Sequence, residues 1–282
     1  MNIAEHFKIQ QVERLDLSHY CRVASGCTVT ATLKKLNESG HNCAFVMQQN
    51  RLVGIFTDRD VLRKVVDDPD CWADPIDSIM TRTPLTVESA AAAMDALHLM
   101  NGHRFRNVPV MDGEDAVVGN LTHFSLMQLA DVLLRNEAAQ EESQPSAQHS
   151  LSFVNLSGLM SDKPITVTAD ATLAEGIDSM RTNDIGSLVV VDARGGIVGV
   201  FSERDVLTKV ACKLEKLDSA TVGDHMSGDV IKLSPRDSIA TALHHMAQRR
   251  IRRLPLVSAT DKPTGVVSFR DIAGYIETSF SL

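Results

Sequence analysis

A pattern that occurs four times constrains the fold of this chain more than any other feature. In each copy a glycine lies three residues before a Ser or Thr, and an Asp follows three residues later in three of the copies. The copies are Val53–Leu62, Val118–Met127, Val198–Leu207 and Thr264–Ala273. The residue three positions after the Ser or Thr is Asp60, Ser125, Asp205 and Asp271 in turn, and these residues are 65, 80 and 66 positions apart. A regular internal period indicates repeated structural units, and the wider middle spacing indicates a duplicated module of two repeats.

The sequence around each copy predicts a strand, a helix, two strands and a helix. In the first unit, Thr28–Ser39 carries a helical apolar stripe, and the apolar runs Ala44–Val46 and Leu52–Phe56 flank a polar turn, as in a hairpin. Helical spacing resumes after Thr57, and the same order returns in the other units. Each unit is too small to bury its own apolar faces, so we expect the units to pair. The expected fold is a mixed α/β (α+β) fold of β-α-β-β-α repeats.

Changes in composition divide the chain into four repeats and two connecting segments. After a helix that is expected to end near Glu137, the chain becomes small, polar and acidic and contains Pro145, which is typical of a flexible linker. We predict a lead-in at 1–22, repeats at 23–80, 81–137, 153–215 and 216–282, and a linker at 138–152.

The bulk composition argues against several classes of function. The net charge of −8 disfavours an extended nucleic-acid surface, which needs concentrated Lys and Arg. The N-terminus has no signal-peptide pattern, and no apolar run approaches the roughly 20 residues of a membrane span. We therefore expect a soluble, cytoplasmic protein that binds neither nucleic acid nor membranes.

The reactive side chains indicate neither a metal site nor an enzyme. The five cysteines are scattered without a Cys-x-x-Cys spacing, which indicates neither a disulfide framework nor a zinc site. The adjacent His244 and His245 would point about 100° apart on a helix, so they cannot easily hold one ion. No nucleophile lies in a recognisable catalytic context. We expect no metal and no catalysis.

The repeated residues resemble the cystathionine-β-synthase (CBS) domain family. The resemblance covers about residues 12 to 278 and rests on the Gly-x-x-[Ser/Thr]-x-x-Asp element and on a preceding strand like Leu254–Val257. It also rests on the pairs Met80-Thr81, Met160-Ser161 and Met226-Ser227, which open the later units. The resemblance implies that two CBS repeats pair into a Bateman module, that two modules associate into a disk, and that the disk binds adenosine-containing ligands. No separate catalytic domain fits in the remaining residues.

A hydroxyl at the end of a strand and an Asp three residues later allow two interpretations. The two residues are a variant of the helix capping box. Alternatively, the carboxylate accepts hydrogen bonds from both hydroxyls of a ribose, as the resemblance implies. The predicted ribose ligands are Thr57 with Asp60, Ser202 with Asp205, and Ser268 with Asp271. Ser125 replaces the Asp in the second unit, so we expect that site to be empty or altered.

Four arginines occur within the five residues that end at Arg253. Such close charges repel one another unless an anion or carboxylates neutralise them, and the planar guanidinium suits phosphate. The alternative is a solvated face paired with surface acids. By resemblance to the gamma subunit of AMP-activated protein kinase, Arg252 and Arg253 would contact phosphate, and the Ile251 backbone would lie near adenine. Arg106 would contribute a weaker phosphate contact, because Asn107 replaces its basic neighbour.

The corresponding stretch of the third unit, Asp184–Ser187, has no basic residue. Gly186 permits a close approach to the backbone, which suits a flat base, so we predict an adenine contact at Ile185 and Gly186. Asp205 and Asp271 would then mark two ribose positions in one cleft that is served by the single arginine cluster.

We therefore expect a non-catalytic regulatory protein that binds AMP, ADP or ATP between paired repeats, mainly in the C-terminal module. Binding would change the association of the modules in an energy-sensing role, with no required cofactor and with a regulated protein partner. The disk would form within one chain or in a homodimer. The N-terminal module, which keeps one complete motif at Asp60, is either structural or takes another ligand. The alternatives are an interaction scaffold with decayed sites and a sensor of S-adenosylmethionine, NAD or a cyclic dinucleotide.

Overall fold

The computed structural model describes residues 2–141, 151–160 and 164–279 and contains the four predicted repeats. Several helices begin directly after a polar residue that caps them. For example, Thr28 Oγ1 accepts a hydrogen bond from the Ala31 N–H at 3.2 Å, and Ser238 Oγ accepts one from the Thr241 N–H at 3.1 Å. These caps satisfy backbone donors that the helix leaves free, which fixes where each helix starts.

The N-terminal module contains repeats 1 and 2. Before it lie α1 (Ile3–Ile9) and η1 (Val12–Arg14). Repeat 1 consists of β1 (Cys21–Ala24), α2 (Val29–Ser39), β2 (Cys43–Gln48), β3 (Arg51–Thr57) and α3 (Asp58–Lys64). The connection to repeat 2 contains η2 (Pro69–Ala73), η3 (Ile76–Ser78) and β4 (Thr81–Arg82). Repeat 2 consists of β5 (Val87–Glu88), α4 (Ala93–Gly102), β6 (Asn107–Met111), β7 (Val117–Thr122) and α5 (His123–Glu141).

The C-terminal module contains repeats 3 and 4 and begins with η4 (Leu156–Gly158). Repeat 3 consists of β8 (Thr166–Thr168), α6 (Leu173–Thr182), β9 (Ser187–Val191), β10 (Ile197–Ser202), α7 (Glu203–Asp205) and the π-helical turn η5 (Val206–Val210). The connection contains η6 (Leu217–Ser219) and α8 (Val222–His225). Repeat 4 consists of α9 (Ile239–Arg249), β11 (Arg253–Val257), β12 (Pro263–Ser268) and α10 (Phe269–Ser279).

The first strand of repeat 4 departs from the predicted β-α-β-β-α order. In repeats 1 to 3 a parallel strand joins the antiparallel hairpin, as β1 joins β2, β5 joins β6, and β8 joins β9. In repeat 4 only a single parallel bridge, between Leu233 and Leu256, takes its place. Leu233 donates to the Pro255 carbonyl and accepts from the Val257 N–H, but Pro235, the next ladder residue, has no N–H to donate. The strand therefore ends after one bridge.

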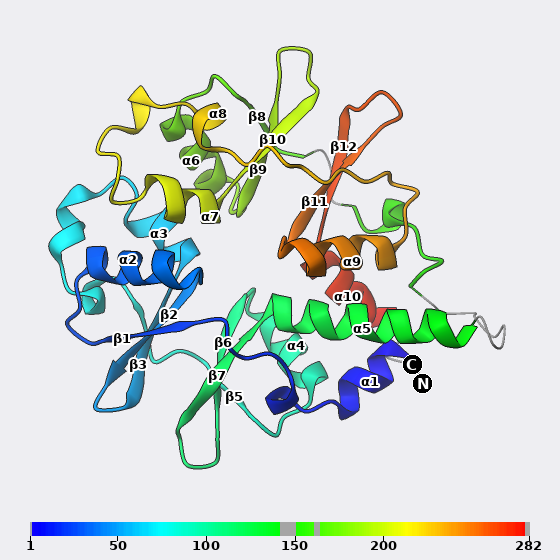
Figure 1. Ribbon diagram of the computed structural model, residues 1–282, viewed down its shortest axis with the longest axis horizontal. Helices are drawn as coiled ribbons and strands as arrows, with labels where there is room; N and C mark the ends of the chain where they lie inside the picture. The colour runs from blue at the N-terminus through cyan, green and yellow to red at the C-terminus, as the bar shows by residue number, and fades with distance from the viewer. Residues whose placement is uncertain (1, 142–150, 161–163, 280–282) are drawn as a thin grey trace.

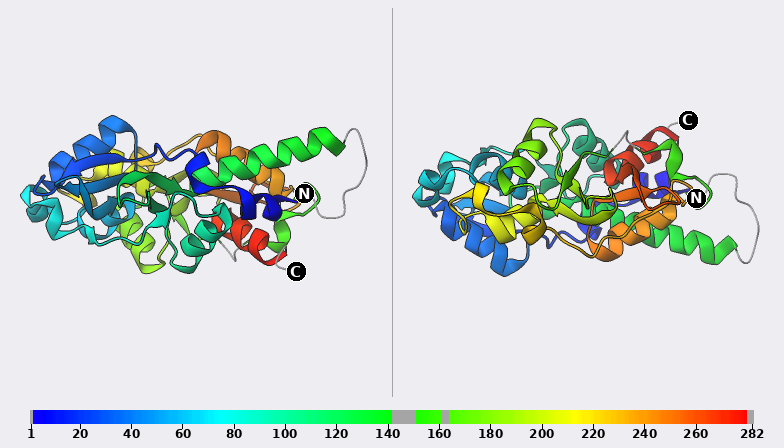
Figure 2. Two further views of the ribbon diagram at one scale, coloured as in Figure 1. Left: turned by 90° about the horizontal axis from the view of Figure 1, so that it is seen from below. Right: turned by 90° about the horizontal axis from the view of Figure 1, so that it is seen from above.

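Four apolar contacts close the repeats into a flattened disk (Figures 1 and 2). The facing sheets of each module pack together: Val117 of repeat 2 lies against Phe45 of repeat 1, and Val257 of repeat 4 lies against Val189 of repeat 3. The helices join the modules, because repeats 1 and 3 share one buried core and repeats 2 and 4 share another, which includes α1. Of the two expected arrangements, the structure has the disk within one chain.

The connecting segments differ in part from their predicted extents. The strand β1 begins at Cys21, inside the predicted lead-in. The helix α5 continues to Glu141, past the predicted start of the linker at 138, and Leu151 is buried at the other end. Residues 142–150 of the predicted linker lie outside the described residues. No helix in the described ranges is long and apolar enough to cross a membrane.

Candidate functional site

The three Asp residues of the repeated motif all form helix caps. In each motif one carboxylate oxygen accepts hydrogen bonds from both the backbone N–H and the hydroxyl of the Ser or Thr three residues earlier. The distances are 3.0 and 2.9 Å for Asp60, 2.9 and 2.6 Å for Asp205, and 2.7 and 2.7 Å for Asp271. The cap occupies one oxygen only, so a ribose would be bound by the other.

The second carboxylate oxygen has a different environment in each motif. Asp60 Oδ1 lies 2.8 Å from Lys64 Nζ. Asp205 Oδ1 accepts from Lys209 Nζ at 2.7 Å and from a serine hydroxyl, Ser227 Oγ, at 3.0 Å. Asp271 Oδ1 accepts no hydrogen bond from the described part of the chain. Asp271 therefore has acceptor capacity to spare, whereas a ribose at Asp205 has to share with or displace existing donors.

The second motif is closed by the N-terminal segment. Ser125 Oγ lies 2.9 Å from Thr122 Oγ1 and donates to the Asp16 carbonyl at 2.6 Å. A Cβ on Gly119 would lie 2.5 Å from the Cβ of Leu17, so the two backbones are in close contact. The segment that contains Asp16 and Leu17 is thus packed against the motif of the second unit, where we expected an empty or altered site.

The register of the four hairpins aligns the residues around the disk centre. The hairpins pair Cys43 with Thr57, Asn107 with Thr122, Ser187 with Ser202, and Arg253 with Ser268. The residue before each first partner is Asn42, Arg106, Gly186 or Arg252. The residue after each Ser or Thr is Asp58, His123, Glu203 or Phe269, and all four are at most 5% exposed. Sequence reasoning missed this second set, although aligning the repeats one residue past each hydroxyl identifies it.

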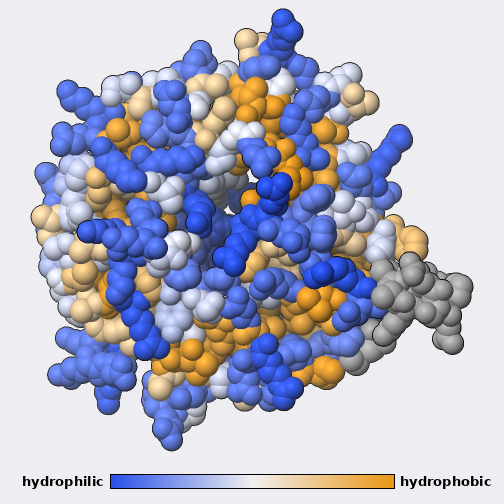
Figure 3. Space-filling model, in the orientation of Figure 1, coloured by the Kyte–Doolittle hydropathy of each residue, from blue (hydrophilic) through white to orange (hydrophobic). Residues whose placement is uncertain are grey.

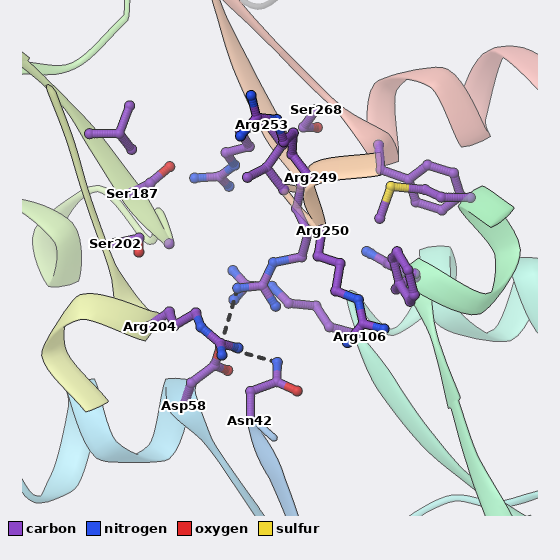
Figure 4. A pocket seen from close by; sticks show the side chains of 18 of the residues that line it. Asn42, Asp58, Arg106, Ser187, Ser202, Arg204, Arg249, Arg250, Arg253 and Ser268 are labelled. Carbon is purple, nitrogen blue, oxygen red and sulfur yellow. Dashed lines mark hydrogen bonds and ion pairs between the residues drawn. The ribbon is translucent and has the colours of Figure 1, made fainter. Parts of the chain in front are cut away.

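Buried ion pairs connect these aligned positions across the module boundary. Glu203 Oε2 accepts from Arg106 Nη1 of repeat 2, and it lies 3.3 Å from Arg252 Nη2 of repeat 4. The same Arg252 nitrogen lies 3.2 Å from Asp58 Oδ2 of repeat 1, which also accepts from Asn42 (Figure 4). Arg252 and Arg106 together lower the pKa of Asp58 against the opposing effect of its burial. Carboxylates therefore neutralise part of the arginine cluster. This is one of the two ways of neutralising it that the sequence predicted, the other being a bound anion.

Gly186 has a packing role that its sequence did not indicate. A Cβ at this position would lie 2.6 Å from Glu203 Oε2 and 2.7 Å from Arg106 Nη2. No side chain fits there without displacing the ion pair. The ion pair fills the side of Gly186 on which a Cβ would lie, and the adenine contact at Ile185 and Gly186 stays a prediction.

A cavity of about 470 Å³ opens at the centre of the disk. In the view of Figure 3, hydrophilic residues surround the hollow in the middle of the face. Its walls include eight of the twelve predicted site residues: Gly186, Ser202, Asp205, Ile251, Arg252, Arg253, Ser268 and Arg106. The other four, Thr57, Asp60, Ile185 and Asp271, are not in its walls. Asp205 and Asp271 thus do not share this cavity.

Two arginines in the cavity wall lack a carboxylate partner. The side chains of Arg253 and Arg270 form no hydrogen bond with the described residues and have none of their carboxylates at ion-pair distance, and neither side chain is fully exposed. Glu203 acts on Arg253, and Asp271 and Asp184 act on Arg270, only from a longer range. Burial and the neighbouring guanidinium of Arg106 lower the pKa of Arg253 to about 10. Burial lowers the pKa of Arg270 as well, with Arg106 as the next cause. Partly buried cations without a partner favour the binding of an anion.

His123 adds an unsatisfied polar atom to the same wall. Its side chain is 5% exposed, and its Nε2 has no hydrogen-bond partner. Burial, and then Arg252 and Arg106, hold the pKa of His123 well below 6.5, so the ring is neutral. The described ranges contain no cluster of three side chains suited to a metal ion.

Comparison with known proteins assigns the family. The CBS-domain family model matches residues 20–67, 76–131, 156–211 and 222–278. The chain belongs to the CBS-domain family. The protein of Methanocaldococcus jannaschii named MJ1225, described as a candidate archaeal homologue of the gamma subunit of AMP-activated protein kinase, has a similar crystal structure, with a TM-score of 0.78. The match covers 94% of this chain and 99% of that one at 16% identity, and it shows a common fold.

The match to this chain covers only part of each curated relative. An uncharacterised 33.4 kDa protein of Thermofilum pendens is 30% identical over 190 residues, which is 67% of this chain and 62% of that protein. The meiotically up-regulated gene 70 protein of Schizosaccharomyces pombe is 26% identical, over 88% of this chain and 41% of that protein. The chain thus spans less than two thirds of these relatives. The family model matches this chain four times, as expected for four CBS repeats that form two Bateman modules.

Proposed function

We propose that this chain is a non-catalytic regulatory protein that binds an adenosine nucleotide in the central cavity, between CBS repeats 3 and 4. The observation that carries the proposal is the pair of arginines, Arg253 and Arg270, which line the cavity with no carboxylate of the described residues at ion-pair distance. A nucleotide phosphate supplies the missing charge, and the guanidinium geometry suits its oxygens. Adenosyl ligands without a phosphate, such as S-adenosylmethionine, would leave both arginines without a phosphate partner.

The other groups of a nucleotide have candidate partners in the same cavity. Ser202 and Asp205 provide the ribose ligands, and Val230 and Ile251 provide an apolar edge for adenine. A ligand in this place would touch residues of both repeats of the C-terminal module. Its binding energy would favour the conformation in which the two repeats are held together, which is how it would shift the association of the modules. Asp271 belongs to a second, separate ribose position.

Titration calorimetry of the full chain with AMP tests this function. We expect Asp205→Ala to weaken binding by about 1–3 kcal/mol, the usual cost of losing hydrogen bonds to a charged group. Asp271→Ala should weaken a second, separate binding event. Ser125→Ala is the matched control and should leave affinity unchanged, since its motif is closed by Asp16. Equal affinity in both Asp variants and the wild type would leave the aspartates with helix capping alone.

An interaction scaffold is the second candidate, and the closed second motif favours it. The segment around Leu17 fills the place beside Gly119, so that motif serves packing. A scaffold would show no rise in melting temperature with AMP, ADP or ATP and would retain a stable protein partner in a pull-down. A rise with any of the three favours the nucleotide-binding function.

A further inference from the structure

Asp58 is one of three Asp residues, with Asp205 and Asp229, in the wall of the arginine-rich cavity. Its side chain is 2% exposed, and its Oδ2 lies 3.2 Å from Arg252 Nη2. Glu203, 1% exposed, contacts the same nitrogen at 3.3 Å and also accepts from Arg106. Both carboxylates come from the N-terminal ends of helices, at the same position of repeats 1 and 3. They place two fixed negative charges at the point where the repeats meet.

The charges in the cavity divide into satisfied and unsatisfied arginines. Arg106 and Arg252 already have carboxylate partners, whereas Arg253 and Arg270 have none at ion-pair distance in the described part of the chain. The other unpaired arginines of the wall, Arg204 and Arg250, are exposed to water and need no counter-ion. One phosphate group carries close to two negative charges at pH 7, which matches the two unpaired and partly buried arginines.

Additional phosphates would extend the ligand toward the carboxylates. With the ribose at Asp205 and the first phosphate at Arg253, further phosphates of the ligand would point to the disk centre, because Asp58 and Arg252 line the same cavity. There a second or third phosphate meets Arg106 and Arg252, whose charges are already paired with the buried carboxylates of Glu203 and Asp58, so it gains no net attraction. A phosphate could bind these arginines only by displacing Asp58 or Glu203, and the displaced buried carboxylate would then repel the phosphate at short range. Such a repulsive element discriminates between ligands that make the same attractive contacts elsewhere.

We propose that Asp58, supported by Glu203, is the residue that determines specificity in this cavity and restricts it to nucleotides with a single phosphate. The inference rests on the proposed function, since it assumes a nucleotide between repeats 3 and 4. It assigns the ligand class as adenosine monophosphate in preference to the triphosphate. The two carboxylates occupy, as part of the protein, the place that further phosphates would need.

Competing affinities of AMP and ATP test the proposal. Calorimetric titration of the full wild-type chain should give at least tenfold tighter binding of AMP than of ATP. Asp58→Asn and Glu203→Gln keep the size of the side chain and one acceptor oxygen, replace the other oxygen by an NH2 donor, and remove one charge each. We expect each to strengthen ATP binding about tenfold and to change AMP binding less than threefold. Asp67→Asn is the control for net charge, because Asp67 pairs with Arg181 outside the central cavity, and it should change neither affinity.

Several results would overturn the proposal. The proposal fails if the wild-type chain binds ATP as tightly as AMP. It also fails if the variants strengthen AMP and ATP binding equally, or strengthen neither. Melting curves identify a variant that fails to fold, and the other variant then decides. Titration with inorganic phosphate and tripolyphosphate separates this proposal from the proposed function. If no nucleotide binds but Asp58→Asn or Glu203→Gln gains tripolyphosphate affinity relative to phosphate, the charge filter stands and the nucleotide function fails; without that gain, both fail.

Discussion

Repeats 1 and 3 differ from repeats 2 and 4 in the charges that they bring to the disk centre, although all four have the same hairpin-to-helix geometry. After the motif hydroxyl, repeats 1 and 3 carry the carboxylates of Asp58 and Glu203, whereas repeats 2 and 4 carry the rings of His123 and Phe269. One residue before the hairpin, repeats 2 and 4 carry arginine. A duplicated backbone has thus acquired acidic and basic halves.

This difference specifies how the two modules face each other. The buried pair of Arg106 with Glu203 joins repeat 2 to repeat 3, and the pair of Arg252 with Asp58 joins repeat 4 to repeat 1. These are the repeats that lie diagonally across the disk, since the shared cores join 1 with 3 and 2 with 4. With one module reversed, the diagonals would oppose carboxylate to carboxylate and arginine to arginine. The ion pairs therefore favour one orientation and penalise the other.

Removal of an acidic charge should have the largest effect on stability. Glu203→Ala leaves Arg106, 10% exposed, without its carboxylate. Breaking a buried ion pair from one side typically costs about 3–5 kcal/mol, and we expect a loss of that size in urea unfolding. Asp229→Ala is the control, because Asp229 pairs with Arg249 at 81% exposure and should cost less than about 1 kcal/mol. Equal losses for the two variants would refute a stabilising role for the central pair.

Crowding the acidic half should have a smaller effect. Gly186→Ala places a Cβ within 2.7 Å of the ion-paired atoms of Glu203 and Arg106. Overpacking of this kind costs about 1–3 kcal/mol, which urea unfolding measures. Gly102→Ala, at the end of α4, meets no atom within 4 Å and should leave the free energy of unfolding unchanged or slightly raised. If Gly186→Ala behaves like Gly102→Ala, the ion pair is free to move aside.

The architecture could be predicted from the sequence because the patterns that determine it are local and occur in every repeat. The hairpins, the helices and the repeated motif all depend on residues within a few positions of one another, and the structure contains them. The loss of the first strand in repeat 4 is also a local effect, caused by Pro235 after Leu233. A single proline in one of four similar units was outweighed by the repeat pattern in the prediction.

The centre of the site could not be predicted in the same way. Asp58 and Arg252 are 194 residues apart in sequence, and Arg106 and Glu203 are 97 apart. An acid in the first turn of a helix is ordinarily explained by the helix dipole, so neither carboxylate stands out before the repeats are placed around one axis. The packing of Gly186 could not be predicted for the same reason, since Glu203 and Arg106, which lie beside it, come from α7 and from repeat 2.

His123 provides the finest test of the comparison, because Phe269 occupies its equivalent position in repeat 4 and shows that an aromatic ring without a proton site fits there. Burial, together with Arg252, Arg106 and Arg270, lowers the pKa of His123 well below 6.5. Above pH 6.5 the ring is neutral in both states and its full contribution to stability is present. Below pH 6.5 the unfolded chain binds a proton that the folded chain excludes, so this contribution is lost as pH falls toward the folded pKa.

The measurement is the free energy of unfolding between pH 7 and pH 5 for the wild type and His123→Phe. One excluded proton contributes a slope of at most about 1.4 kcal/mol per pH unit, and His123→Phe should remove this part of the slope while other groups, including His41, still titrate. A nucleotide phosphate beside the neighbouring arginines would offset the positive field that keeps His123 neutral, so saturating AMP should also flatten the slope in the wild type and not in His123→Phe. Identical pH profiles for the two chains would mean that the ring is hydrated or already protonated at neutral pH, and that repeats 2 and 4 differ at this position in shape alone.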